Sequence, residues 1–272
     1  AAPHNGSGPF IVQLAGREPE WMRIGAELAE AAGADIIDIN MGCPAKKVTG
    51  GQSGCALMRE PELARQLISA TVAGTKRPVT VKMRLGWDDA SLNAPEIARL
   101  AEGEGAQMVT VHGRTRMQFY TDEANWSRIA AVVEAINLPV IANGDIEDEA
   151  SAREAMEKSG AAGVMIGRGA EGRPWRLAQI SNAVFGTPYL APTRDEKLAS
   201  MLNQIASSVD LYGERLGVRV VRKHVAAFVD AWCEDHGLAP MVETRAALCR
   251  IESSSALQDA LATALASRRD AT

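Results

Sequence analysis

Six short apolar runs rich in β-branched residues recur along the first part of the chain, separated by segments of helical spacing. Runs of this length, bounded by glycine, proline and polar residues, are typical of buried strands. The runs are Phe10–Leu14, Asp35–Ile39, Val79–Met83, Met108–Val111, Val140–Ala142 and Val164–Ile166. The alternation of strand and helix predicts an α/β protein with a parallel sheet covered by helices.

Two further features refine this prediction. Ile36, Ile37 and Ile39 are β-branched, which indicates a strand buried on both faces. Glycines stand where the helices that follow the strands should end, because glycine is favoured at helix C-termini. These glycines are Gly33, Gly74, Gly105 and Gly160.

Six strands suit an open doubly wound sheet and are too few for an eight-stranded barrel. However, Asn143-Gly144-Asp145 and Gly167-Arg168-Gly169 follow the last two strands, and barrels often hold a cofactor phosphate after strands seven and eight. We therefore expect a (β/α)8 TIM-type barrel that lacks its first two βα units. The start of the chain, Ala1–Gly8, has no initiator methionine and looks like a cut end.

The strand pattern stops before residue 190, near Pro188 and Pro192, and only helical spacing follows. The predicted helices are Met201–Tyr212, Val218–His236, Met241–Ile251 and Ser255–Ser267. We expect two domains, the incomplete barrel over residues 1–189 and an all-α helical bundle over residues 190–272.

The second of these helices carries an apolar stripe on one side and a basic flank on the other. The stripe consists of Val218, Val221, Val225, Phe228, Val229 and Trp232, and the flank of Arg215, Arg219, Arg222 and Lys223. The flank is either a solvated charged face or a local site for nucleic acid.

Composition narrows the class of protein. A net charge of −5 argues against a protein that coats nucleic acid, so any such contact must use a local basic patch. The four cysteines are far apart and form no Cys-x-x-Cys motif, which predicts neither a metal site nor a disulfide framework. No apolar run reaches the length of a membrane span, and no signal peptide is seen. A reducing, cytoplasmic setting fits best.

Cys43 lies in a Gly-Cys-Pro turn directly after the Asp35–Ile39 strand. The carboxyl ends of parallel strands are where ligands bind in α/β proteins. Cys43 is therefore either a reactive thiol that faces a cleft or a small buried hydrophobe.

Polar residues of the kinds that a flavin site uses end other strands. Gln13 is either a donor to the edge of an isoalloxazine ring or a packing amide. Lys82, inside an apolar strand, needs an anionic partner, which a reduced flavin or a structural carboxylate would supply. His112 is either a donor to the ring or its phosphate, or a structural histidine. Arg168, between two glycines, suits a phosphate.

The turn Asn40-Met41-Gly42-Cys43-Pro44-Ala45-Lys46-Lys47-Val48 is accompanied by Val81-Lys82-Met83-Arg84 and His112-Gly113-Arg114-Thr115-Arg116. With the two glycine-rich turns, these motifs resemble those of the tRNA-dihydrouridine synthases, especially bacterial subfamily B, over nearly the whole chain. The resemblance implies a barrel that binds FMN, a C-terminal helical domain that binds tRNA, and NADPH as reductant. We also expect a monomer. The family's Pro-Met-x-x-x-Thr-Asp segment on its first strand is not found here, in agreement with the missing strands.

The resemblance also implies roles for individual residues. Cys43 would be the proton donor. FMN would be held by Gln13, Lys82, His112, Asn143, Gly144, Asp145, Gly167 and Arg168. The tRNA would be contacted by Asn40, Arg114, Arg116, Arg219, Arg222 and Lys223, with the Arg114–Tyr120 stretch taking part.

The reaction that the resemblance implies is reduction of the uracil C5=C6 bond, with hydride from FMN N5 to C6 and a proton from Cys43 to C5. The target uridine must be unstacked to enter the barrel mouth. Lys46, Lys47 and the following glycines suggest a mobile lid, and Cys55 is expected to pack in the interior. Two alternatives stay open: a flavin enzyme that acts on free pyrimidines, whose turn is Asn-x-Ser-Cys-Pro, and a non-catalytic RNA-binding fragment.

Overall fold

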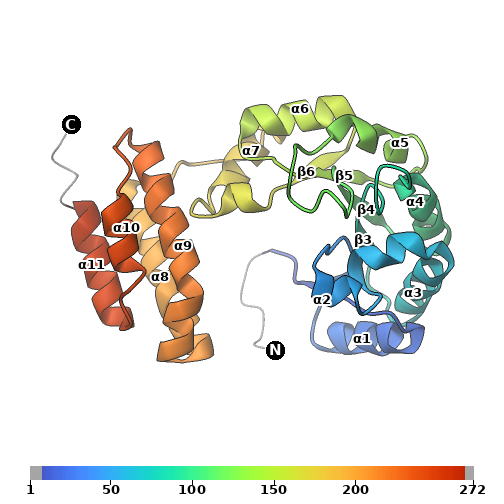
Figure 1. Ribbon diagram of the computed structural model, residues 1–272, viewed down its shortest axis with the longest axis horizontal. Coiled ribbons are helices and arrows are strands. Elements are labelled where there is room, and N and C mark those ends of the chain that lie inside the picture. The colour runs from blue at the N-terminus through green and yellow to red at the C-terminus, as the bar shows by residue number, and fades with distance from the viewer. Residues whose placement is uncertain (1–7, 267–272) are drawn as a thin grey trace. The chain divides into compact units, whose positions relative to one another are not determined.

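The computed structural model describes residues 8–266. These residues form two compact units, one that ends at Gly167 and one that begins at Arg168. Figure 1 shows the strands in the first unit and the long helices α8 and α9 in the second.

The first unit alternates strands and helices, as the sequence predicts. Its strands are β1 (Ile11–Leu14), β2 (Ile36–Met41), β3 (Val79–Arg84), β4 (Met108–His112), β5 (Val140–Asn143) and β6 (Gly163–Met165). Its helices are α1 (Pro19–Ala31), α2 (Lys46–Thr49), α3 (Pro61–Ala73), α4 (Ala94–Gly103), α5 (Ala130–Val133) and α6 (Glu149–Ser159), with 3₁₀ turns η1 (Gly54–Arg59) and η2 (Trp126–Ile129).

Helix boundaries follow local chemistry. Proline stands in the first turn of α1, α3 and α4, where its fixed φ fits and its missing N–H is not needed. Gly74 caps α3 and Gly160 ends α6 in the left-handed conformation, as predicted. Gly33 and Gly105, shortly after α1 and α4, also have positive φ angles.

All six strands are parallel, and each pairs with the next one in the chain, in the order β1-β2-β3-β4-β5-β6. A doubly wound sheet would reverse its order at a switch point, and this sheet does not. The predicted parallel α/β fold is confirmed, and the sequential order is that of consecutive units of a TIM-type barrel. That two further βα units belong to the fold stays a prediction.

The two faces of the sheet differ sharply. In β2 burial alternates, so Ile37, Ile39 and Met41 lie under helices while Asp38 and Asn40 are only partly buried on the other face. The prediction that this strand is buried on both faces is therefore wrong for the described chain. Figure 1 shows α1, α3 and α4 around the outer side of the curved sheet, which leaves the polar face on the inner side.

The second unit begins with η3 (Arg168–Ala170) and α7 (Arg176–Phe185), followed by α8 (Arg194–Tyr212), α9 (Glu214–Asp235), α10 (Val242–Leu248) and α11 (Ser254–Ala266). Helix α8 starts earlier than predicted because Thr193 and Glu196 form a capping box. The predicted stripe on α9 is buried in one hydrophobic core with residues of α8, α10 and α11. Ser267, the last residue of the predicted fourth helix, lies outside the described residues.

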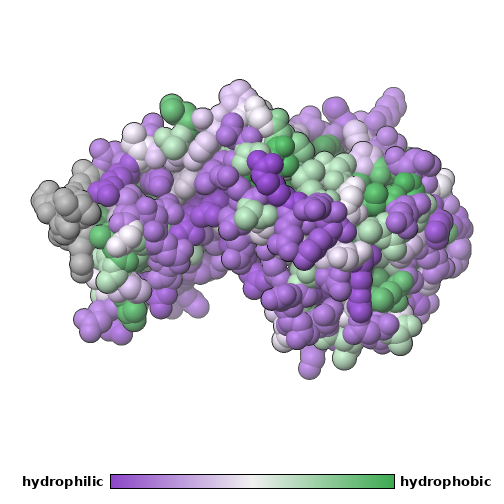
Figure 2. All heavy atoms as spheres, turned by 90° about the horizontal axis from the view of Figure 1, so that it is seen from above, coloured by the Kyte–Doolittle hydropathy of each residue, from purple (hydrophilic) through white to green (hydrophobic). Residues whose placement is uncertain are grey.

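The division between the units comes earlier than the predicted boundary between residues 189 and 190. Arg173 explains why this segment groups with the helices, since it pairs with Glu234 and Asp235 and donates to the Ala231 carbonyl, all on α9. The face of the molecule in Figure 2 is mainly hydrophilic, with scattered hydrophobic residues. Among residues 8–266, no helix meets the length and hydropathy needed to span a bilayer.

Candidate active site

A row of hydrogen-bonded polar side chains crosses the inner face of the sheet and joins β1, β2 and β3. Gln13 donates from Nε2 to Asp38 Oδ2 at 2.7 Å and accepts from Asn40 Nδ2 at 2.8 Å. Thr80 donates to Asp38 Oδ1 at 2.6 Å. The parallel register places Gln13, Asp38 and Thr80 side by side. Burial raises the pKa of Asp38, while the bonds from Thr80 and Gln13 oppose that shift.

Asn40 shapes the turn that carries Cys43. Its Oδ1 atom accepts from the backbone N–H groups of Gly42 at 3.1 Å and Cys43 at 3.0 Å. Both ends of the Asn40 amide are thus engaged within the protein, so the tRNA contact expected for Asn40 would require it to leave these partners. The Cys43 carbonyl accepts from the N–H of Cys55 at 3.0 Å, and the Cys43 side chain is half-buried.

Arg84, the last residue of β3, is buried and joins that turn to the loop after β4. Its Nε donates to the Gly42 carbonyl at 3.0 Å. Its Nη1 donates to the carbonyls of Thr115 at 2.8 Å and Phe119 at 2.7 Å. The guanidinium therefore sets the distance between the Cys43 turn and the Thr115–Phe119 segment.

Lys82 is a partly buried cation. Among the described residues its ammonium forms no hydrogen bond and no ion pair. Its pKa is lowered, mainly by burial and then by Arg84, whereas Asp38 and Cys43 are near enough to oppose the shift electrostatically. Lys82 and Cys43 thus lie at the same end of the sheet, and an anionic ligand there would be stabilised.

His112, at the end of β4, stands beside Arg84 and Asn143 in the strand register. Burial and the nearby cations Arg84, Lys82 and Arg114 lower its pKa to about 3. The imidazole is therefore neutral near pH 7. Its buried Nδ1 atom has no hydrogen-bond partner in the described chain, which marks a place where a ligand atom would be accommodated.

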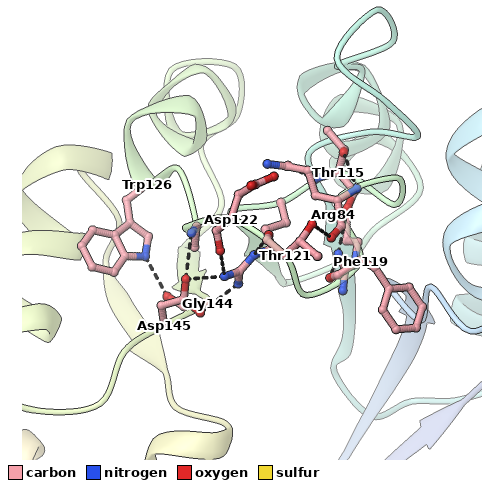
Figure 3. Close-up of polar contacts among 11 residues, drawn as sticks. Arg84, Thr115, Phe119, Thr121, Asp122, Trp126, Gly144 and Asp145 are labelled. Carbon is pink, nitrogen blue, oxygen red and sulfur yellow. Dashed lines mark hydrogen bonds and ion pairs between the residues drawn. The ribbon is translucent and has the colours of Figure 1, made fainter.

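The turn after β5 requires a glycine at position 144 and directs the Asp145 carboxylate toward Arg114. Gly144 has a φ of 112°, and a Cβ there would lie 2.8 Å from the Ala124 Cβ. The Asp145 carboxylate pairs with Arg114 and accepts from the Ala124 N–H at 2.8 Å, while Trp126 Nε1 donates to the Gly144 carbonyl at 2.8 Å. Figure 3 shows the Trp126 indole nitrogen pointing toward the Gly144–Asp145 turn.

The remaining residues predicted to hold the cofactor differ in their placement. Asn143 is buried and donates to the Met165 carbonyl at 2.8 Å, which ties β5 to β6. Gly167 ends the first unit and Arg168 begins the second. The role of Gly167 and Arg168 toward a phosphate stays a prediction.

Arg114, for which a tRNA contact is expected, is buried and bonded to neighbouring loops. Its side chain is 3% exposed, and it donates to the carbonyls of Thr121 and Asp122 and to both carboxylate oxygens of Asp145. Four of its five N–H groups are thus engaged within the protein, so the tRNA contact expected for Arg114 would require it to leave these partners and stays a prediction. Arg116 is half-buried and lies over the Trp87 ring at 4.9 Å.

The basic flank of α9 belongs to the second unit. Arg215, Arg219 and Arg222 line a groove of about 470 Å³ together with Glu214 and Glu252. Arg219 is exposed, whereas Arg222 is partly buried and donates to the Ile251 carbonyl at 3.1 Å. Lys223 is exposed. The structure thus gives Arg222 a structural bond, leaves Arg219 exposed, and places Lys223 in a long, exposed ion pair with Glu171 at 3.9 Å that a ligand could displace.

Sequence reasoning missed Asp38, Thr80 and the contacts of Arg84. The spacing along the strands could have identified them, since Asp38 stands two positions before Asn40, and Arg84 stands two positions after Lys82. Residues two apart on a strand share a face. Among the described residues, no cluster of three or more His, Cys, Asp and Glu side chains is arranged to hold a metal ion.

Comparison with known proteins agrees with the motifs. The family described as "Dihydrouridine synthase (Dus)" matches residues 1–264. A Rhodobacter capsulatus protein named "Probable tRNA-dihydrouridine synthase" is 56% identical over 82% of this chain and 69% of its own length. A Rickettsia conorii protein of the same name is 47% identical over 92% of this chain and 74% of its own length. The "tRNA-dihydrouridine synthase B" of Yersinia pestis is 41% identical over 92% of this chain and 76% of its own length. The chain therefore belongs to the dihydrouridine synthase family.

Proposed function

We propose that this protein is a tRNA-dihydrouridine synthase that reduces the C5=C6 bond of specific uridines in tRNA, with FMN as cofactor and NADPH as reductant. Family membership supports the reaction. The observation that carries the chemistry is that the turn with Cys43 follows β2 beside the end of β3 that carries Lys82, a cation without a hydrogen-bond or ion-pair partner among the described residues. That edge is where barrel enzymes place their active sites.

The inner face of the sheet fits a flat, anionic cofactor. Lys82 and Arg84 supply positive charge beside the Nδ1 atom of His112, which lacks a partner within the described chain. The amide of Gln13 would meet the polar edge of the ring, and Gly144 permits close approach of the backbone. FMN would be held by Gln13, Lys82, His112, Asn143, Gly144, Asp145, Gly167 and Arg168. When bound, FMN supplies the hydride that reaches C6 of the uracil ring.

Asp145 would contribute to that site through its backbone. Its carboxylate is already shared between Arg114 and the Ala124 N–H. A free carboxylate would repel a phosphate. Because Arg114 neutralises the Asp145 carboxylate, an anion can bind nearby.

In the reaction, the protein's own residues would supply a proton and stabilise negative charge in the site. Cys43 would donate its thiol proton to C5 of the uracil ring as a general acid. Asn40 fixes the backbone of the Cys43 turn through two N–H bonds. Lys82 would stabilise negative charge that develops in the site.

The tRNA must present an unstacked uridine, since the site lies on the inner face of a sheet. We propose that the second unit binds the tRNA backbone through Arg219 and Lys223, with Arg222 on the same helix. A local patch of this kind is compatible with the acidic net charge of −5.

The test has three arms on the purified chain. A visible absorption spectrum after incubation with FMN should show bound flavin. Unmodified tRNA and NADPH should yield dihydrouridine, and free uracil should not be reduced. Reduction of free uracil would support the pyrimidine dehydrogenase alternative. Binding of tRNA without flavin binding or turnover would support the RNA-binding alternative.

A further inference from the structure

The segment from Thr115 to Thr121, in the loop after β4, has its polar groups turned inward and its large apolar side chains turned outward. Met117 is 59% exposed, Phe119 is 42% exposed and Tyr120 is 50% exposed. Exposed loops ordinarily show the opposite arrangement, with apolar side chains buried and polar groups in water. Clustered exposed apolar side chains indicate a binding surface.

The loop is braced by hydrogen bonds. Arg84 donates to the carbonyls of Thr115 and Phe119. The Thr115 N–H donates to Gln118 Oε1 at 2.8 Å, and the Thr121 hydroxyl donates to the Gln118 carbonyl at 2.7 Å. The apolar side chains are therefore displayed on a pre-organised backbone, which reduces the entropy lost when a ligand binds.

Phe119 adopts a conformation that costs free energy. Its φ is 55°, in the left-handed region. Glycine, asparagine and aspartate adopt this region most readily, and bulky residues rarely do. Strained residues held in place by their surroundings cluster at ligand sites. Figure 3 shows the Phe119 ring turned away from the hydrogen bonds that hold its backbone.

The two exposed rings form a corner. Phe119 and Tyr120 pack edge to face with centroids 4.8 Å apart. The Arg84 guanidinium lies 5.4 Å from the centroid of the Tyr120 ring. Two half-exposed rings with a cation beside one of them suit the stacking of a flat heteroaromatic group.

Arg116, in the same segment, links this corner to elements that carry further cations. Arg116 Nη2 lies 3.5 Å from Thr49 Oγ1 in α2, the helix that carries the exposed Lys46 and Lys47. Arg59 and Arg116 each lie over the Trp87 ring, at 4.8 and 4.9 Å. A ligand that combines flat rings with negative charge, as a nucleic acid does, fits this mixture of rings and cations.

We propose that Phe119 and Tyr120 form a stacking platform for an unpaired nucleobase of the RNA substrate, next to the uridine that is reduced. The proposal rests on the proposed function and adds to it a site for a second base. Arg84 fixes the platform relative to the reactive turn, because the same guanidinium donates to the Gly42 carbonyl. Stacking the neighbouring base there would hold the strand open while the target uridine enters the site.

The test uses variants that remove the Phe119 ring and replace it with residues that favour the positive φ at this position. Phe119→Gly and Phe119→Asn both favour a positive φ, so their melting temperatures should equal or exceed that of the wild type. Direct binding of unmodified tRNA should weaken roughly 5- to 150-fold, the range for removal of one base–aromatic stack. Phe119→Trp should retain most of the affinity. Flavin reduction by NADPH without tRNA should not change.

Trp21→Ala is the matched control, since Trp21 is a 65% exposed aromatic residue on α1, on the outer side of the sheet. It should bind tRNA as the wild type does. Unchanged tRNA affinity in both Phe119 variants would overturn the platform, and so would a weakened response to NADPH alone, which would assign the rings to the dinucleotide. Wild-type protein that forms no dihydrouridine would instead refute the proposed function.

Discussion

The Arg114 guanidinium donates to both carboxylate oxygens of Asp145, from Nη1 to Oδ1 at 2.8 Å and from Nη2 to Oδ2 at 2.5 Å. This pair joins the loop after β4 to the turn after β5. Two more of its five N–H groups donate to the carbonyls of Thr121 and Asp122. One side chain thus ties the Thr121–Asp122 backbone to the residue that follows Gly144.

Replacing Asp145 with Asn should destabilise the fold while keeping the backbone conformation, since asparagine tolerates the φ of 52° at this position. Loss of the charge leaves the buried Arg114 without its counter-ion. We expect a loss of about 1 to 3 kcal/mol, below the value for a fully buried pair because Asp145 is partly exposed. Thermal unfolding measures the effect. Glu154→Gln, which breaks the surface pair with Lys158, should change stability little, and an equal loss in both variants would contradict the role of Arg114.

Cys43→Ala should slow uridine reduction in tRNA by roughly 10² to 10⁴, the usual contribution of a general acid. Flavin binding and flavin reduction by NADPH should not change, because the thiol acts only on the substrate. Single-turnover mixing of the reduced enzyme with unmodified tRNA separates these steps. A variant that reduces uridine at the wild-type rate would remove Cys43 from the reaction.

Cys55 should be chemically inert in the folded protein. It is fully buried, and burial raises the pKa of its thiol to about 12. At pH 8 the thiol is therefore protonated and unreactive toward iodoacetamide. Peptide mapping after timed alkylation should find Cys43 modified first and Cys55 only after denaturation. Equal rates at the two cysteines would show that the interior around Cys55 opens readily.

His112 should make stability fall as the pH falls. Its pKa is about 3 in the folded protein and about 6.5 when unfolded. Above pH 6.5 the imidazole is neutral in both states, so its full contribution is present. Below pH 6.5 the unfolded chain gains a proton that the folded chain refuses, so stability is lost as the pH falls toward 3.

The His112→Gln variant tests this dependence. From pH 7 to pH 5, the melting temperature of the wild type should fall by more than that of the variant. Other titrating groups, such as Asp38 and His224, are present in both proteins and contribute equally to this comparison. A difference that stays constant with pH would mean that His112 is protonated in the folded protein.

Reversing charge at Arg219 and Lys223 to Glu should weaken tRNA binding and reduce its salt dependence. These exposed residues stand one turn apart on α9. The slope of log affinity against log salt should fall by about 1 for each phosphate that the variant no longer binds. Arg99→Glu, on the exposed side of α4, is the control for a change in net charge. An equal weakening in the Arg99 variant would assign the effect to net charge alone.

Much of the first unit was predictable from local pattern. The six apolar runs became the six strands of a parallel sheet, because β-branched runs between glycines have few alternatives. Residues after those strands, such as Cys43 and Asn143, could be placed at one edge from topology alone. The start of α8 was missed because the Thr193 capping box was not considered.

The roles of individual cations could not be predicted in the same way. Arg114 and Arg116 are alike in sequence, yet only the Arg114 side chain is almost wholly buried. The difference arises because Asp145, thirty-one positions later, supplies a counter-ion from another strand end. The same holds for Arg84, whose partners Gly42 and Phe119 come from two separate loops.

By itself, the sequence determined the parallel α/β fold, the family and the identity of the residues at the strand ends, because these depend on periodicity and on motifs within a few positions. Only the tertiary structure decided which polar groups face each other. It coupled Gln13 to Asp38, left Lys82 without a partner within the described chain, and displayed Phe119 on a strained backbone. These outcomes depend on contacts between segments far apart in the chain, where burial and the competition for hydrogen-bond partners are settled by packing.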